Sequence, residues 1–201
     1  VEVRPPYPTQ RGLFGQPTVV NNVETFSSIL PILARGGSEY AKIGTEKSTG
    51  TKLISLDSGF NRPGVYEVPM GTPLETALWE LGKGFSRPTK AVQIGGPLGG
   101  IVPKSRWGDL TMEFESFSNA GFLLGHGNIL AIPDSFPMIE YIRHLFQFTA
   151  AESCGKCFPC RLGSQRGFEL ADRAMNRQGT IDNRLFEDLL VRLADGKLLL
   201  A

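Results

Sequence analysis

The sequence predicts an α+β protein in which a small β-grasp domain is followed by an all-α helical bundle that carries a cysteine loop. Short apolar and β-branched runs, separated by turn residues, fill residues 52–133. Helical periodicity takes over after Pro133, and three cysteines lie between the first two helical segments that follow. The order strand, strand, helix, strand, with more strand later, favours the β-grasp arrangement.

Composition narrows the possible function classes. The chain has 201 residues, 41% hydrophobic and 20% charged, as is ordinary for a globular protein. A net charge of +1 gives no electrostatic case for nucleic acid or an anionic membrane. The longest apolar runs, such as 121–125 and 129–133, are too short to insert into a bilayer. No signal peptide opens the chain. Because the chain begins at Val1 without an initiator Met, we expect a fragment of a longer polypeptide.

The region 1–51 is predicted to be a proline-rich lead-in followed by one helix and a polar connection. Asn21 is the expected N-cap, with Glu24 as its capping-box partner. Pro31 should kink or restart the helix, and Gly36-Gly37 should end it. The apolar positions at helical spacing are Val23, Phe26, Ile29, Leu30 and Leu33.

In the second region, "KLISLDS" and "GVYEVP" predict a β-hairpin around the turn-rich "GFNRP". A helix should follow, with Thr72 as N-cap, Pro73 at its first position, Glu75 in a capping box and Gly82 as its end. Its expected buried stripe consists of Leu74, Ala77, Leu78 and Leu81.

Three further strands are expected at "KAVQI", "LTMEF" and "NILAIP". The first of them runs into a glycine-rich turn that contains Gly95, Gly96, Gly99 and Gly100. Since no phosphate-cradling helix pattern follows these glycines, we interpret them as a structural turn and not as a nucleotide site.

Residues 134–201 should form three helices. Asp182 is the expected cap of the third helix and Gly196 its end. The apolar positions are Met138, Ile139, Ile142, Leu145 and Phe146 in the first, Phe168, Leu170, Ala171, Ala174 and Met175 in the second, and Leu185, Phe186, Leu189, Leu190 and Leu193 in the third. The cysteines would then occupy the loop between the first two helices.

The chain's three cysteines, Cys154, Cys157 and Cys160, form a C-x2-C-x2-C run. An odd, crowded set indicates a reducing compartment and thiolates kept for a metal. Thiolates select zinc, copper(I) or iron–sulfur clusters, and structural zinc sites usually use two separated pairs. Three ligands at this spacing are typical of [4Fe–4S] proteins. A zinc site and redox-inert thiols remain alternatives.

A fourth ligand is not evident. The ferredoxin-type fourth cysteine is missing after Cys160, and the chain's two histidines are His126, in a predicted turn, and His144, off the apolar stripe of its helix. Either histidine could serve, but we expect a cysteine beyond Ala201. Lys156 and Arg161 flank the thiolates. These two cations either raise the reduction potential of an anionic cluster or are solvated surface charges.

Three motifs carry a family resemblance: "RGLFGQPTVVNNVET", "RPGVYEVPMGTPL" and "ESCGKCFPCRLG". In this order they resemble the C-terminal half of the NADH-binding flavoprotein subunit of respiratory complex I. Similar subunits are the β subunit of NAD-dependent formate dehydrogenase, to which "GKCFPCRLGS" looks closest, and the diaphorase subunit of NAD-reducing hydrogenase. The resemblance covers nearly the whole chain.

The resemblance implies a domain organisation. Residues 1–51 would pack on a flavin domain that is missing here, 52–133 would be a β-grasp domain of the SLBB type, and 134–201 a truncated helical iron–sulfur domain. Cys154, Cys157 and Cys160 would bind three corners of a [4Fe–4S] cluster. The family's fourth cysteine falls near or after the end of this chain, where "DGKLLLA" contains none.

The resemblance also implies that Asn21, Asn22 and Thr25 contact FMN, because helix N-terminal amides suit a polar or anionic cofactor. The alternative is a well-capped helix without a ligand. The full subunit would use NAD(H) as substrate and pass electrons between FMN and the cluster, in an NADH:quinone oxidoreductase or an NAD-dependent formate dehydrogenase.

Expected partners are the other subunits of such a complex, including a [2Fe–2S] subunit, in the cytoplasm and peripheral to the inner membrane through those partners. We expect the isolated fragment not to be catalytic. Two alternative functions have no redox role: a zinc-stapled interaction module, and a cofactor-free scaffold on which other subunits dock.

Overall fold

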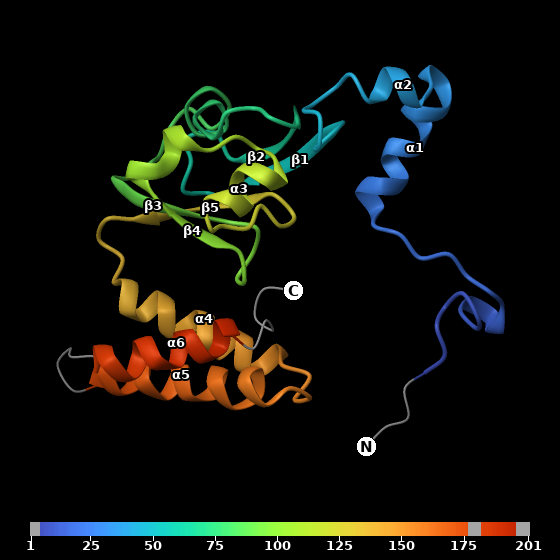
Figure 1. Ribbon diagram of the computed structural model, residues 1–201. Coiled ribbons are helices and arrows are strands. Elements are labelled where there is room, and N and C mark those ends of the chain that lie inside the picture. Colours follow the sequence, from blue (N-terminus) through green and yellow to red (C-terminus); the bar gives the residue numbers. More distant parts are fainter. Residues whose placement is uncertain (1–4, 177–181, 196–201) are drawn as a thin grey trace.

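A computed structural model describes residues 5–176 and 182–195. Figure 1 shows a sheet domain above a layer of helices, with the N-terminal segment extending to one side. This segment holds a short 3-10 turn, η1 (Leu13–Gly15), and two helices, α1 (Val23–Arg35) and α2 (Gly37–Tyr40). The residues of α1 are not buried.

The sheet has five strands in the order β2-β1-β5-β3-β4. The predicted hairpin is confirmed as β1 (Thr51–Leu56) and β2 (Gly64–Pro69), which pair antiparallel. β5 (Asn128–Pro133) runs parallel to β1, and β3 (Thr89–Ile94) is antiparallel to both β5 and β4 (Gly100–Pro103). The first and last strands thus lie side by side in the middle, and the predicted α+β class is confirmed.

The main core lies on one sheet face beneath three short helices, η2 (Thr76–Leu81), η3 (Lys104–Asp109) and α3 (Phe114–Asn119). Side chains alternate along β1, so that Ile54 and Leu56 point into the core. Fully enclosed side chains include Leu74, Leu78, Val92, Ile94, Leu110, Met112 and Phe117.

The predicted strand at 110–114 is wrong. Thr111 makes an isolated bridge with Pro73, and the chain turns into α3 at Phe114. The segment that contains Pro73 becomes helical at the next residue, so the two segments cannot form a longer ladder. The Thr111 N–H group donates to Ser116 Oγ at 3.0 Å, which satisfies the backbone locally. β4, which begins at the last glycine of the predicted turn, was not predicted.

The predicted capping of the helix at 72–82 is also wrong. Thr72 Oγ1 donates to the carbonyl of Pro69 at 2.7 Å and does not cap the helix. η2 is wound as a π-helix, and Glu75 lies before its first residue without a side-chain cap bond. The predicted buried stripe is nevertheless present, with Leu74, Ala77 and Leu78 fully enclosed and Leu81 packed beside them. Gly82 follows its last residue, as expected.

α1 begins one residue later than predicted. Its N-cap is Asn22, whose Oδ1 accepts the Glu24 N–H at 2.8 Å, so Asn21 lies outside the helix. Glu24 does not close a capping box, because its carboxylate is turned toward the sheet. The helix runs through Pro31 without the predicted restart and ends at Gly36, whose φ is 90°.

Three helices form the second layer: α4 (Met138–Glu152), α5 (Phe158–Asn176) and α6 (Asn183–Asp195). A Cβ at Gly167 of α5 would lie 2.3 Å from the Phe146 ring of α4, so this glycine permits the close approach of the two helices. Asp182 caps α6 as predicted, since its Oδ1 accepts the Leu185 N–H at 3.0 Å. Gly196 and the residues after it lie outside the described part of the chain.

Candidate metal centre

The three cysteines lie where α4 gives way to α5. Cys154 is exposed on the connecting loop, whereas Cys157 and Cys160 are half-buried. The carbonyl of Cys157 accepts the Arg161 N–H at 2.9 Å, the first hydrogen bond of α5. Cys160 therefore belongs to the first helical turn and not to the loop, which corrects the prediction. The reason is that α5 begins well ahead of its buried apolar stripe.

Gly155 shapes the loop between the first two cysteines. Its φ of 71° is a left-handed conformation that favours glycine. In this conformation the Gly155 N–H donates to Ser153 Oγ at 3.2 Å, and its carbonyl accepts a hydrogen bond from Arg161 Nη1 at 3.1 Å. Of the two predicted flanking cations, Arg161 is thus hydrogen-bonded to the loop, while Lys156 is exposed.

Two positively charged features lie beside the cysteines. The amino end of the 19-residue helix α5 carries Cys157 and Cys160, and a helix N-terminus stabilises nearby anions. The Arg161 guanidinium adds a positive charge beside the loop. In addition, Cys160 Sγ lies 3.3 Å from Ser153 Oγ, within hydrogen-bonding distance.

The donor set, three thiols within seven residues, has the chemistry and spacing of an iron–sulfur site. Zinc needs all its sulfur ligands at about 2.3 Å from a single point. Within residues 5–176 and 182–195, no three Cys, His, Asp or Glu side chains are gathered tightly enough to hold one ion. A cubane suits a wider set, because each thiolate binds a different iron atom.

Neither histidine joins the cysteines. His126 is exposed in the sheet domain, where its ring lies against the glycine turn at Gly96. His144 is exposed on α4. Among the described residues, neither ring belongs to a group of three or more side chains that could hold a metal ion.

The three residues predicted to contact FMN lie together at the start of α1, and all three are exposed. Asn22 uses its side-chain oxygen as the helix cap, while Thr25 lines an open cleft of about 450 Å³ between α1 and the start of β1. The structure does not bring this group to the cysteines, because α1 and α5 belong to separate parts of the molecule (Figure 1).

Two residues of the site were missed by sequence reasoning. Ser153 directly precedes Cys154, and a hydroxyl beside a potential ligand is a signal that the sequence does contain. Glu24 was assigned to a capping box, whereas its carboxylate accepts the Leu53 N–H at 2.7 Å. No local pattern could have revealed that contact, because its partner lies on a strand far along the chain.

Comparison with known proteins places the cysteine region in a family. Residues 140–197 match the NADH-ubiquinone oxidoreductase-F iron-sulfur binding region. All three cysteines and the whole of α5 fall inside this match. Among the helices of the described part of the chain, none combines the length and apolar character that a bilayer crossing needs.

Relatives and solved structures extend the similarity over most of the chain. It is 37% identical to the NADP-reducing hydrogenase subunit HndC of Solidesulfovibrio fructosivorans, over 88% of this chain and 36% of that protein. It is 36% identical to the F-type subunit of NADH-quinone oxidoreductase of Escherichia coli (strain K12), over 96% of this chain and 44% of that protein. A crystal structure of NAD+-reducing [NiFe]-hydrogenase in the H2-reduced state superposes with a TM-score of 0.74 at 31% identity, over 97% of this chain and 32% of that one.

The chain thus spans less than half the length of these curated relatives. The family model covers most of α4, the cysteine-bearing junction and α5, and the superposed structure covers nearly the whole chain, including the sheet. The chain belongs to the family of the F-type subunits of NADH-quinone oxidoreductases and the related hydrogenase subunits, and it corresponds to the C-terminal region of these flavoprotein subunits, with a 4Fe-4S binding region that contains Cys154, Cys157 and Cys160.

Proposed function

We propose that this chain is the electron-transfer segment of an NAD(H)-linked oxidoreductase subunit, passing electrons between FMN and a [4Fe–4S] cluster. The observation that carries the proposal is the position of three thiols at the α4–α5 junction, inside the matched iron–sulfur region. When bound, the cluster supplies a one-electron redox centre. The fourth ligand would be a cysteine outside this sequence.

The chain's own residues would hold and shield the cluster. Cys154, Cys157 and Cys160 bind it, the amino end of α5 and Arg161 compensate its negative charge, and Gly155 sets the loop's curvature. Two apolar side chains of the first turns of α5, Phe158 and Leu162, are exposed near the cysteines. They would exclude water once a partner subunit covers this end.

α1 would contribute to the FMN-binding part of the full subunit. Asn21, Asn22 and Thr25 would contact FMN, while the apolar stripe of α1 would pack on the flavin-binding domain of the full subunit. All five members of that stripe are exposed here, an arrangement that indicates a docking surface. The full subunit would take NAD(H) as substrate.

The relatives support a wider proposal. Because they are NADH-quinone oxidoreductase and hydrogenase subunits, we propose other subunits of such a complex as partners, including a [2Fe–2S] subunit. The protein would lie in the cytoplasm and reach the inner membrane through those partners. An NAD-dependent formate dehydrogenase remains the more specific proposal, supported by the "GKCFPCRLGS" motif.

The decisive experiment replaces Cys157 by Ala in the full-length subunit. Cys157→Ala should abolish the [4Fe–4S] electron paramagnetic resonance signal and lower iron and labile sulfide, while bound FMN is kept. His144→Ala is the matched control, because this exposed residue of the same helical region should leave the cluster intact. Zinc in place of iron in the wild type, or a cluster that survives Cys157→Ala, would refute the proposal.

The flavin contacts need a separate test. Asn21→Ala is the informative variant, because Asn22→Ala would also remove the cap of α1. Asn21→Ala should weaken FMN binding, measured by flavin fluorescence, without changing iron content. Ser27→Ala, an exposed residue of α1 whose hydroxyl bonds only its own helix, should have no effect. Equal FMN affinity in all three proteins would remove Asn21 from the site.

A further inference from the structure

A hydroxyl group lies against one of the three cysteine sulfurs. Ser153 ends α4 and Cys160 lies in the first turn of α5, yet Ser153 Oγ and Cys160 Sγ are 3.3 Å apart. The contact therefore joins the two helices across the loop that holds the other two cysteines. Within residues 5–176 and 182–195, Cys160 is the only cysteine whose sulfur has a recorded side-chain hydrogen bond.

The direction of this hydrogen bond is fixed once Cys160 binds iron. A free thiol could donate or accept, but a thiolate has no proton and can only accept. Ser153 Oγ already accepts the Gly155 N–H at 3.2 Å, so its single proton remains available for the sulfur. The Ser153 hydroxyl thus accepts a hydrogen bond from the Gly155 N–H and can donate its own proton to the Cys160 sulfur.

We infer that Ser153 is a positioning residue that raises the reduction potential of the cluster by donating a hydrogen bond to the Cys160 thiolate. The inference rests on the proposed cluster. Reduction adds negative charge that spreads onto the thiolate sulfurs, so a donor stabilises the reduced state more than the oxidised one. Hydrogen bonds to the sulfurs are one of the means by which a protein sets such potentials.

The same turn offers a matched comparison. Ser164 is one helical turn beyond Cys160 and is fully buried, but its hydroxyl donates to the Cys160 carbonyl oxygen at 2.6 Å and not to the sulfur. Removing either hydroxyl deletes one oxygen atom beside the same cysteine. Only the Ser153 change deletes a bond to the ligating atom.

The test is a redox titration of the full-length subunit, with the cluster followed by electron paramagnetic resonance. Ser153→Ala should lower the equilibrium constant for one-electron reduction about tenfold, a midpoint shift of about 59 mV. Ser153→Thr keeps the hydroxyl and should restore the wild-type potential. Ser164→Ala should leave the potential unchanged.

Distinct outcomes separate this inference from the proposed function. A wild-type subunit without iron refutes the proposed function itself. A full cluster content in Ser153→Ala with an unchanged potential overturns the inference alone, as does an equal shift in Ser164→Ala. If Ser153→Ala does not assemble a cluster, the hydrogen bond is tested in the wild type instead. Resonance Raman spectra in H2O and D2O then show whether an exchangeable proton is bonded to a cluster sulfur. A deuterium-sensitive Fe–S stretch that persists in Ser164→Ala supports the bond, and its absence in the wild type overturns it.

Discussion

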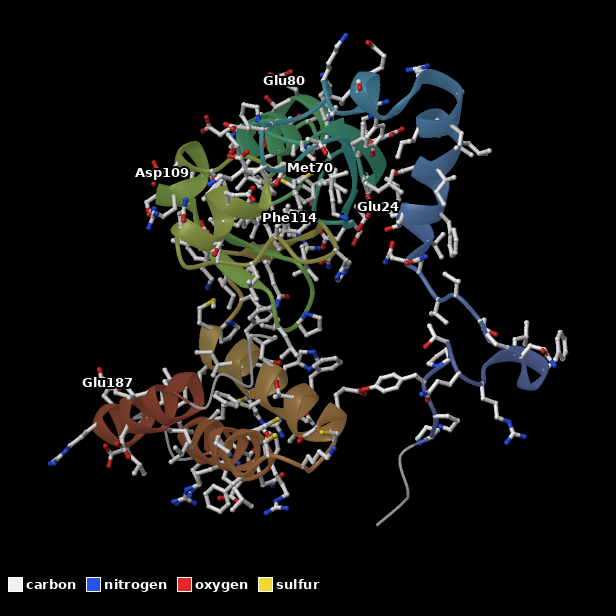
Figure 2. The ribbon with its side chains drawn as sticks, turned by 45° about the vertical axis from the view of Figure 1, so that its right-hand side comes forward. Glu24, Met70, Glu80, Asp109, Phe114 and Glu187 are labelled. Carbon is white, nitrogen blue, oxygen red and sulfur yellow. The ribbon has the colours of Figure 1, made fainter. Side chains whose placement is uncertain are left out.

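The carboxylate of Glu24 on α1 forms an ion pair with the ammonium group of Lys52 on β1, a side chain that is buried in the sheet domain. Figure 2 shows Glu24 on the side of α1 that faces the sheet. The same carboxylate accepts the Leu53 N–H at 2.7 Å. Because β5 pairs with β1 only at Ser55 and Leu56, the first half of β1 has an open edge here, and Glu24 covers it. This contact anchors the helix that bears the proposed FMN residues.

Glu24→Gln should lower the free energy of unfolding by roughly 1–3 kcal/mol, because the Lys52 ammonium would remain buried without a counter-charge. Urea unfolding followed by circular dichroism measures the change. The control is Glu39→Gln, which breaks an exposed ion pair with Lys42 and should change stability by less than about 0.5 kcal/mol. Equal effects of the two variants would show that Glu24 is no anchor.

The Glu24 contact should also fail in acid. Burial alone would raise the pKa of the Glu24 carboxyl, but the Leu53 N–H and the Lys52 charge outweigh it and hold the pKa below its ordinary value of 4.5. A lowered pKa means that the stabilisation is fully present above pH 4.5 and is lost as pH falls through the folded-state pKa. Amide exchange at Leu53, measured by NMR over this range, should show protection that disappears on acidification. In Glu24→Gln this pH dependence should be absent.

A buried hydrogen bond joins the sheet domain to the helical layer, with the Tyr141 hydroxyl of α4 donating to Gln93 Oε1 of β3. Burial raises the pKa of Tyr141 to about 12, so the hydroxyl keeps its proton across the physiological range. The Gln93 Nε2 atom is already buried and has no hydrogen-bond partner among the residues that the structure describes. Tyr141→Phe would therefore leave both polar atoms of the Gln93 amide unsatisfied.

We expect Tyr141→Phe to destabilise the protein by about 1–3 kcal/mol and the double variant Tyr141→Phe/Gln93→Leu to recover much of that loss. Replacing both partners removes the buried unpaired groups together. A double-mutant cycle by urea unfolding measures the coupling. Strictly additive effects would mean that the two side chains do not interact.

Gly155→Ala should strain the cysteine loop. Its φ of 71° costs about 1–2 kcal/mol for a residue with a Cβ, although there is space for the methyl group. In the full-length subunit we expect a lower iron content per protein after identical reconstitution. Gly37→Ala is the matched control, because Gly37 has no positive φ and nothing within 4 Å of an added Cβ. Equal iron content in the two variants would contradict this role of Gly155.

Much of the architecture could be predicted because it depends on local patterns. The hairpin, the stripe of Leu74, Ala77 and Leu78, and the cap at Asp182 all follow from residues within a few positions of one another. The prediction failed where a distant segment competes for the same group. Glu24 has a local capping role available, but a strand edge and a buried ammonium group outweigh it.

By itself, the sequence determined the ligand chemistry, because the spacing of Cys154, Cys157 and Cys160 is a covalent property of the chain and thiolates select their metals by softness. Only the tertiary structure decided where α5 begins, and with it that Cys160 lies in a helical turn beside the Ser153 hydroxyl. The physical reason is that the α4–α5 packing sets the path of the loop, and two atoms on different helices meet only after that packing is complete.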